Sequence, residues 1–366
     1  MKLWFIMGTA AELIKMYPVI DQAERRKLDW YLWSTGQGST NFWNQYDDFQ
    51  LPRARSFNFD DKATDLHSSG QAIRWMARNI FHRPGKIRKI IKEKIGFAPE
   101  KADYCFVHGD TFSTLLGAIQ SRLLGCQLVH VEAGMRSGSI WSPFPEELNR
   151  RLVSRLTHYH FAPDENAAQH LRQEKQKGTI VITGGNSVYD ALLATLSKPR
   201  PTDLPQAPYI VANLHRFENL HSTEYWQKIV ETSIRAAARY PVYFVMHPPT
   251  EAKINADPAM KERLLKGGVI LLGRQSYTRF VHLLAGAHHV LTDGGSNQTE
   301  CAYLGIPCLI MRSKTELPEG LGKNCVLSEF RAERIDQFLR DPDFYQRPKE
   351  TLSRSPSGLV FENLPI

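Results

Sequence analysis

Short apolar runs alternate along the whole chain with longer stretches in which apolar residues recur at helical spacing. The apolar runs have the length and composition of buried strands and cover residues 3–7, 30–34, 104–108, 127–131, 158–162, 179–183, 209–212, 242–246, 269–272, 289–292 and 308–311. Helical patterns between them cover residues such as 12–25, 114–124, 146–156 and 227–238. Strand, helix and strand in this order predict an α/β fold with parallel sheets and right-handed crossovers.

The length of the chain indicates more than one such sheet. A chain of 366 residues is too long for one ordinary core and suits two domains of roughly 150–200 residues each. The polar segment 173–178 (QEKQKG) lies between two predicted strands and is a candidate linker, so we predict a domain boundary between residues 172 and 173. Two doubly wound domains that face each other would bind a ligand between the carboxyl ends of their sheets.

Cysteine usage and hydropathy indicate a cytoplasmic protein. The five cysteines are an odd number without a close CxxC pair, and most of them lie in apolar segments, as buried free thiols do. A disulfide framework or a zinc site is therefore not expected, and a reducing compartment fits best. The apolar run 3–7 is too short for a signal peptide, and no run reaches the roughly 20 residues of a membrane-spanning helix.

The formal net charge of +8 admits nucleic acid, an anionic membrane or a polyanionic substrate as a partner. Part of this charge is local, because residues 82–101 (HRPGKIRKIIKEKIGFAPEK) combine many cations with isoleucines at helical spacing. The pattern favours a surface helix with a solvated basic face. A helix that lies peripherally on anionic lipid is the alternative.

Polar clusters stand at the predicted carboxyl ends of five strands. They are GTAAE (8–12), HGDT (108–111), HVEAG (130–134), NLHRFEN (213–219) and TDGGSNQTE (292–300). One such cluster would indicate only a strand-to-helix turn with a capping residue. Because all five occupy the same position relative to a strand, we infer a shared site.

Three acidic residues in or near these clusters are candidates for proton transfer. Asp110 suits a helix cap as well as a catalytic acid. Glu132 directly follows a buried strand, where a carboxylate is either paired or functional. Glu146 lies four residues before Arg150 on a predicted helix, so these two could also form a surface ion pair. Together the three acids would suit proton transfer at carbon-bound hydrogen.

A second group of residues suits a phosphate-bearing ligand. The Gly-Gly-Ser turn 294–296 lies between a strand and a helix, so its backbone N–H groups can approach a phosphate. Glu300, one turn into that helix, can accept hydrogen bonds from ribose hydroxyls. His215 and Arg216 would supply cations at another strand end, and a diphosphate requires such donors.

Several collinear segments carry a more specific signal. They are GTAAELIKMYPVI (8–20), VHGDT (107–111), HVEAGMRSGSIWSPFPEELNR (130–150), VITGGNSVYDAL (181–192), LHRFEN (214–219), MHPP (246–249) and LTDGGSNQTECAYLGIPCLIMRSKTELPEG (291–320). By these segments the chain resembles the non-hydrolysing UDP-N-acetylglucosamine 2-epimerase family. The resemblance covers most of the chain, and the block 130–150 is long and distinctive.

The resemblance implies a GT-B fold, in which two Rossmann-like doubly wound domains face each other across a central cleft. It implies that residues 173–366 hold UDP and residues 1–172 hold the sugar and the catalytic acids, with the C-terminal end returning to the N-terminal domain. It also implies an enzyme of surface polysaccharide synthesis that interconverts UDP-N-acetylglucosamine and UDP-N-acetylmannosamine. UDP is eliminated, the C2 proton is removed, and both return with inverted C2 stereochemistry. The implied partners are a UDP-sugar and a second copy of the chain rather than nucleic acid, and no metal or other cofactor is expected.

The same match implies roles for individual residues. Asp110, Glu132 and Glu146 fall on the family's carboxylates near the sugar, and His215 falls on the histidine near the diphosphate. The substrate-binding positions are Lys15, Arg150, Arg216, Gly294, Gly295, Ser296 and Glu300.

The chain also departs from the family's motifs. Ala10, Phe217 and Leu317 stand where the family has arginines, and Thr299 stands where it has an acid. The family's TGQH element appears as TGQG (35–38), so a regulatory second sugar-nucleotide site is left open. The loss of three arginines near an anionic ligand suggests altered chemistry.

Two other classes of function therefore stay open. A glycosyltransferase on the same scaffold would pass the sugar of a UDP-sugar donor to a lipid-linked or glycan acceptor. The basic stretch 82–101 mildly favours it, because a lipid-linked acceptor lies at a membrane. A non-catalytic UDP-sugar binder is the third class, and the retained acids speak against it. The fold alone cannot choose among these classes.

Overall fold

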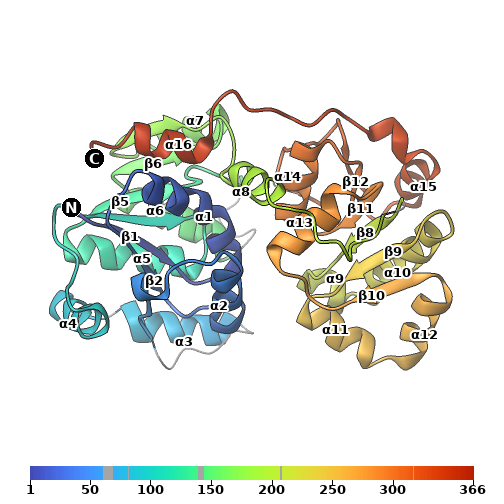
Figure 1. Cartoon of the computed structure of the whole chain (residues 1–366), viewed down its shortest axis with the longest axis horizontal. Coiled ribbons are helices and arrows are strands. Elements are labelled where there is room, and N and C mark those ends of the chain that lie inside the picture. Colours follow the sequence, from blue (N-terminus) through green and yellow to red (C-terminus); the bar gives the residue numbers. More distant parts are fainter. Residues whose placement is uncertain (61–68, 81, 139–143, 207, 316) are drawn as a thin grey trace. The chain divides into compact units, whose positions relative to one another are not determined.

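The computed structural model describes residues 1–60, 69–80, 82–138, 144–206, 208–315 and 317–366. These residues form two compact units (Figure 1). The first unit contains Met1–Ala191 together with Leu352–Ile366, and the second contains Leu192–Thr351. Each unit has its own parallel sheet with helices, so the predicted α/β class is confirmed.

The sheet of the first unit has seven strands in the order β3-β2-β1-β4-β5-β6-β7, and every pairing is parallel. The strands are β1 (Leu3–Met7), β2 (Trp30–Ser34), β3 (Ser56–Asn58), β4 (Tyr104–His108), β5 (Gln127–Val131), β6 (Tyr159–Ala162) and β7 (Thr179–Ile182). Strands β1 and β4 are buried along their whole length, as strands covered on both faces must be. Their continuous apolar pattern is the reason that sequence reasoning could locate them.

Helices cover this sheet on both faces (Figure 1). They are α1 (Ala10–Arg25), α2 (Ser39–Asp48), α3 (Ser69–Ile80), α4 (Pro84–Ile95), α5 (Phe112–Leu124), α6 (Glu146–Leu156), α7 (Glu165–Gln173), α8 (Val188–Leu196) and α16 (Pro356–Glu362), with a 3-10 turn at Arg53–Arg55. The C-terminal helix α16 packs against α1. It is fixed there by a 2.7 Å hydrogen bond from the Ser357 amide to Asp190 and by Phe361, whose ring stacks on Phe106.

The predicted boundary at 172/173 differs from the division in the structure. Strand β7 pairs with β6 from Tyr159↔Thr179 to Ala162↔Ile182 and so completes the first sheet. The polar segment 173–178 is therefore the connection between α7 and β7 inside the first unit. A short polar connection between adjacent elements has the same composition as a linker between domains, so composition could not separate the two.

The sheet of the second unit has six parallel strands in the order β10-β9-β8-β11-β12-β13. The strands are β8 (Ile210–Asn213), β9 (Val242–Val245), β10 (Val269–Leu272), β11 (His289–Thr292), β12 (Cys308–Ile310) and β13 (Cys325–Leu327). The helices are α9 (Phe217–His221), α10 (Thr223–Ala237), α11 (Pro248–Asn255), α12 (Pro258–Lys266), α13 (Tyr277–Ala285), α14 (Gly295–Leu304) and α15 (Ala332–Arg340), with a 3-10 turn at Pro342–Tyr345.

The turn after β1 shows how local sequence starts a helix. Thr9 caps α1 by accepting a hydrogen bond from the Glu12 amide, and Glu12 accepts one in return from the Thr9 amide at 2.8 Å. This reciprocal capping box is the S/T-x-x-E pattern of TAAE. Glycine is required at position 8, because a Cβ there would lie 2.2 Å from the hydroxyl oxygens of Ser113 and Thr35. These two hydroxyl groups are hydrogen-bonded to each other at 2.7 Å, which links the residue after β2 to the start of α5.

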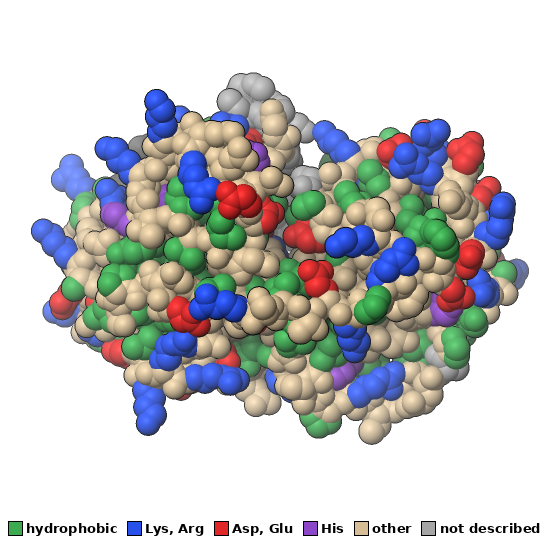
Figure 2. Space-filling model, turned by 90° about the horizontal axis from the view of Figure 1, so that it is seen from above, with side chains coloured by type: hydrophobic (Ala, Val, Ile, Leu, Met, Phe, Trp, Pro, Cys, Tyr) green, Lys and Arg blue, Asp and Glu red, His purple; other side chains and the backbone are tan. Residues whose placement is uncertain are grey.

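The basic segment forms α4, whose apolar side chains belong to the core of the first unit. Ile87 and Ile91 are fully buried, and Ile90 and Ile95 pack against the same cluster. The four lysines of α4 are exposed, as the favoured interpretation of a surface helix requires, whereas Arg88 is half-buried and donates to the Pro99 and Leu124 carbonyl oxygens. On the face shown in Figure 2, Lys and Arg side chains are scattered among uncharged ones. Within the described residues, none of the helices combines the length and the apolar character needed to cross a bilayer.

All five cysteines are buried free thiols, as predicted. In the second unit, Cys308 and Cys325 are register partners on neighbouring strands, and Cys301 lies on α14. Burial raises the pKa of Cys301, whereas the neighbouring thiol and then burial raise the pKa of Cys308 and of Cys325. All three thiols are therefore weak nucleophiles.

Candidate active site

Glu132 lies at the centre of a polar cluster formed by the carboxyl ends of β4 and β5 and by α1. Its carboxylate oxygen Oε2 is 2.7 Å from the Lys15 ammonium and 3.3 Å from Nε2 of His108. The side-chain amide of Asn186 donates a hydrogen bond to the same oxygen. Two of the predicted residues, Lys15 and Glu132, are thus brought together from positions far apart in the chain.

The charge on Glu132 is strongly stabilised. Burial by itself raises the pKa of this carboxyl group, but Lys15 and His108 together hold it well below its ordinary value. The carboxylate is therefore ionised at neutral pH, and the same contacts lower its basicity. The Glu132 backbone has a φ of 62°, in the left-handed region that non-glycine residues rarely adopt. Such strain costs roughly 1–3 kcal/mol and persists where surrounding contacts enforce it, often at functional sites.

Asp110 is paired with Arg150 rather than acting as a helix cap. Nε and Nη2 of Arg150 lie 2.8 and 2.6 Å from Oδ2 of Asp110, and the Asn149 side chain donates to the Asp110 carbonyl oxygen at 2.9 Å. The N-cap of α5 is Thr111. Burial lowers the pKa of Arg150, but the attraction of Asp110 outweighs this and raises it overall, so the guanidinium stays charged.

Glu146 takes no part in an i,i+4 ion pair with Arg150, which was the surface alternative considered from the sequence. Arg150 instead contacts Asp110 and, at 3.4 Å, Glu147. The Oε2 atom of Glu146 is buried and has no hydrogen-bond partner among the described residues. A buried acceptor without a partner is costly, so an atom of this kind is a candidate for contact with a ligand.

Sequence reasoning missed three polar residues of the first unit. His108 and Asn186 contact Glu132, and Glu147 is the buried acid that contacts Arg150. All three lie inside the motif segments, but they carried no separate signal because only the fold brings their partners to them. Residues 139–143 of the motif 130–150 and residue 316 of the motif 291–320 lie outside the described residues.

In the second unit, Asp293 ties the turn after β8 to the end of β11. Its fully buried carboxylate accepts hydrogen bonds from the backbone amides of His215 and Arg216 and from the Asn219 side chain, at 2.8 to 3.1 Å. Arg216 also donates through Nε to the Asp293 carbonyl oxygen at 2.9 Å. This network holds the turn that carries two of the predicted residues.

His215 does not supply the cation expected from the sequence. Its ring packs against that of His247, with ring centroids 4.2 Å apart. Burial, followed by the nearby Arg216, lowers the pKa of His215 to about 4, and burial and His215 lower that of His247 to about 3. Both rings are neutral at neutral pH, so the positive charge of this turn comes from Arg216.

The predicted phosphate turn begins α14. Gly294 is the N-cap residue and has no side chain to bond the first helical amides, and Ser296 follows in the first turn. The space beside both glycines is filled, because a Cβ on Gly294 would lie 2.9 Å from Oδ1 of Asn297 and one on Gly295 would lie 2.8 Å from Leu317. The uncapped amides at this helix start are of the kind that bind anions.

Glu300 is almost completely buried on α14. Its carboxylate accepts a 3.1 Å hydrogen bond from Asn297, and it lies beside the Tyr277 hydroxyl. Burial, and then the charge of Glu300, raise the pKa of Tyr277 well above its ordinary value. Glu300 therefore lies in a defined polar setting, and its contact with a ribose stays a prediction.

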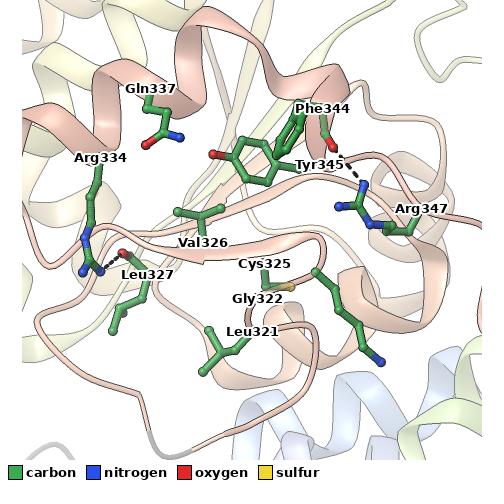
Figure 3. Close-up of a pocket in the computed structure, with 11 residues that line it drawn as sticks. Leu321, Gly322, Cys325, Val326, Leu327, Arg334, Gln337, Phe344, Tyr345 and Arg347 are labelled. Atoms are coloured by element: carbon green, nitrogen blue, oxygen red, sulfur yellow. Dashed lines mark hydrogen bonds between the residues drawn. The ribbon is translucent and has the colours of Figure 1, made fainter.

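One hollow of the second unit lies apart from all these residues. It has a volume of about 470 Å³ and lies over the edge strand β13, between α15 and the 3-10 turn at Pro342–Tyr345 (Figure 3). Two arginines at its rim are already engaged, because Arg334 donates to the Leu327 carbonyl oxygen and Arg347 to that of Phe344. It contains none of the predicted site residues.

Comparison with known proteins decides the family. A family model described as UDP-N-acetylglucosamine 2-epimerase matches residues 22–351, which is most of the chain. This chain belongs to the UDP-N-acetylglucosamine 2-epimerase family. A relative from Yersinia pestis, the UDP-N-acetylglucosamine 2-epimerase, is 30% identical over 351 residues, which cover 89% of this chain and 86% of the relative. The same enzyme of Salmonella typhimurium is 32% identical over 278 residues, covering 70% and 71%.

Solved structures of epimerases have the same architecture. The UDP-GlcNAc 2-epimerase from Neisseria meningitidis bound to UDP-GlcNAc aligns with a TM-score of 0.81 at 25% identity, over 99% of both chains. The Methanocaldococcus jannaschii enzyme in complex with UDP-GlcNAc and UDP aligns with a TM-score of 0.78 at 26% identity, over 99% of this chain and 98% of that one. The scaffold is the GT-B type, and the family is one of sugar-nucleotide 2-epimerases, which are isomerases.

A glycosyltransferase has the same scaffold at greater distance. A UDP-glucosyltransferase from Polygonum tinctorium aligns with a TM-score of 0.60 at 14% identity, over 99% of this chain and 97% of that one. This likeness concerns the fold alone. The choice between epimerase and transferase therefore rests on the family match and on the site residues.

Proposed function

We propose that this protein interconverts UDP-N-acetylglucosamine and UDP-N-acetylmannosamine by elimination and re-addition of UDP. The observation that carries the proposal is Glu132, an ionised carboxylate on a strained backbone, held by Lys15 and His108. Removal of a proton from carbon requires a positioned base that is unprotonated at neutral pH. The family match supports the same reaction.

Inversion at C2 requires that a proton leaves from one face of the sugar and arrives at the other, so two acid–base groups are needed. Glu132 is suited to accept a proton because it is ionised. The buried Oε2 atom of Glu146 has no hydrogen-bond partner among the described residues, so a ligand can contact it. Asp110 is oriented by Arg150. We assign these three acids to the sugar, with Lys15 as a nearby cation.

We assign the UDP moiety to the second unit. The uncapped start of α14 at Gly294, Gly295 and Ser296 suits the diphosphate, with Arg216 as the cation and His215 as a neutral hydrogen-bonding group. Glu300 is proposed to bind the ribose. The leaving group is a stabilised anion, so fixed dipoles and one cation can support its departure without a metal.

The expected setting of the enzyme is also a proposal. We infer a cytoplasmic homodimer whose product supplies surface polysaccharide synthesis, and the five buried free thiols fit a reducing compartment. The apolar side of α4 already packs in the core. Peripheral contact with an anionic membrane would therefore use the basic side of this helix.

Incubation with UDP-N-acetylglucosamine in heavy water, followed by proton NMR, tests the reaction. We expect deuterium at C2 and the appearance of UDP-N-acetylmannosamine. Release of free UDP without exchange at C2 would instead indicate hydrolysis, and UDP release that depends on an added acceptor would indicate glycosyl transfer.

A further inference from the structure

Glu147 is the most deeply buried charged side chain around the proposed sugar site, with no exposed surface. Its Oε2 atom lies 3.4 Å from Nη1 of Arg150 and accepts hydrogen bonds from the Ser137 amide at 3.1 Å and from the Ser137 hydroxyl at 3.3 Å. Its Oε1 atom accepts a 3.0 Å hydrogen bond from Arg151. A buried carboxylate persists only when it is paired in this way.

The charges around Glu147 balance one another. Arg150 lies between Asp110 and Glu147, and Arg151 lies between Glu147 and Glu174. Arg136 closes the series by donating to both oxygens of Glu174 at 2.7 and 2.9 Å. Three acids thus face three arginines. Removing Glu147 would leave one buried cation in excess.

We propose that Glu147 is a positioning residue for the reaction, an inference that rests on the proposed function. It holds the Arg150 guanidinium from the side opposite Asp110, and it fixes the turn at Ser137 that leads out of the Glu132 motif. Helix α6 thereby sets the positions of Asp110, Arg150 and Glu146 relative to one another. Glu147 itself has no surface through which to touch the substrate.

The expected kinetic signature follows from this indirect role. Neutral glutamine at position 147 can still accept from Ser137, but it gives Arg150 no opposing charge. The guanidinium is then free to shift, and Asp110 shifts with it. A displacement of about 1 Å in a catalytic group can cost on the order of a hundredfold in rate. Because UDP supplies binding contacts elsewhere, we expect the loss in kcat and little change in KM.

The test compares Glu147→Gln with Glu165→Gln, which removes an exposed acid of α7 that pairs with Arg172. For Glu147→Gln we expect kcat to fall by at least about tenfold while KM changes by less than about twofold. Glu165→Gln should match the wild type. The double variant Glu147→Gln/Asp110→Asn should be no slower than Asp110→Asn alone, because residues that act through one another are not additive.

Three outcomes would overturn the inference. These are a folded Glu147→Gln enzyme with wild-type kcat, a loss confined to KM, or a double variant whose losses multiply. If Glu147→Gln does not fold, Glu147→Asp keeps the buried charge but shortens its reach; a several-fold lower kcat supports the inference and wild-type kcat rejects it. The proposed function fails separately, by absence of C2 exchange in the wild-type enzyme.

Discussion

At the scale of single residues, the decisive property of the proposed site is that one largely buried carboxylate is kept charged. Glu132 combines a left-handed backbone, a 2.7 Å contact with Lys15 and a pKa held well below its ordinary value. The left-handed backbone costs free energy, and both the ion pair and the lowered pKa require specific partners. Their coincidence at one residue is better explained by chemistry than by packing.

The three acids give the first prediction. We expect Glu132→Gln, Asp110→Asn and Glu146→Gln each to lower turnover by at least about 100-fold, the usual size for loss of a general acid or base. UDP binding, measured by calorimetry, should stay close to that of the wild type, because the acids are assigned to the sugar. Wild-type turnover in all three variants would show that these residues have structural roles and take no part in catalysis.

The buried histidines give a prediction about pH. Burial lowers the pKa of His130 and of His289 to about 3, while an unfolded histidine titrates near 6.5. Between these values the unfolded chain binds more protons, so the free energy of unfolding must fall as the pH drops from about 6.5 toward 4. Urea unfolding measured across this range should show the decline.

A matched pair of variants identifies the source of that decline. His289→Asn removes a buried histidine and should flatten the dependence of unfolding free energy on pH, whatever its effect on stability at pH 7. His221→Asn removes an exposed histidine of α9 and serves as the control. An unchanged pH dependence in the first variant would show that the proton uptake lies at other groups.

At the scale of elements, a single helix or turn contains several residues of the proposed site. Helix α6 presents Glu146, Glu147 and Arg150, and the turn before α9 presents His215 and Arg216. The spacing inside each element comes from the helix itself. The attachment of the element to its sheet comes from buried polar contacts such as those of Glu147 and Asp293.

Asn219 allows a test of that attachment. Its side chain donates to Asp293 at 2.8 Å and to the Met311 carbonyl oxygen at 2.9 Å, and it is buried. Asn219→Ala leaves both acceptors without this donor, which should cost about 1–3 kcal/mol of stability in urea unfolding. Because the turn also carries Arg216, UDP binding should weaken in calorimetry. A variant that keeps wild-type UDP affinity would show that this turn does not contribute to UDP binding.

At the scale of the whole molecule, the chain forms two units with different proposed tasks. The first unit has the paired acids around β4 and β5, and the second has the uncapped helix start and the His215 turn. The final segment, Leu352–Ile366, leaves the second unit and packs on α1. If the second unit binds UDP and the first binds the sugar, the nucleotide and the sugar should contribute separately to binding.

Ligand-dependent melting tests this division. UDP should raise the melting temperature more than free N-acetylhexosamine at the same concentration, because the nucleotide is assigned most of the binding contacts. A ligand present at 100 times its Kd stabilises the native state by about 2.7 kcal/mol. A melting temperature that does not respond to millimolar UDP would contradict the nucleotide assignment.

The sequence by itself determined the class of fold, most strands and the family. Strands such as β1 and β4 are apolar throughout because they are buried on both faces, so their pattern is visible without a structure. The three-residue strands β3 and β13 were not predicted, since so short a run has no periodicity. The equally short β12 was predicted because it lies within the longer apolar run 306–311. The acids, Lys15 and the glycine turn became candidates because they stand in long motif segments, and their roles stay predictions.

Only the tertiary structure decided which of these residues act on one another. It assigned Arg150 to Asp110 and Glu147 rather than to Glu146, and it placed β7 in the first sheet. It also made His215 neutral, because burial and a neighbouring guanidinium disfavour a second positive charge. Residue type and spacing are local properties, but ion pairing, burial and pKa depend on groups that the fold brings together from distant parts of the chain.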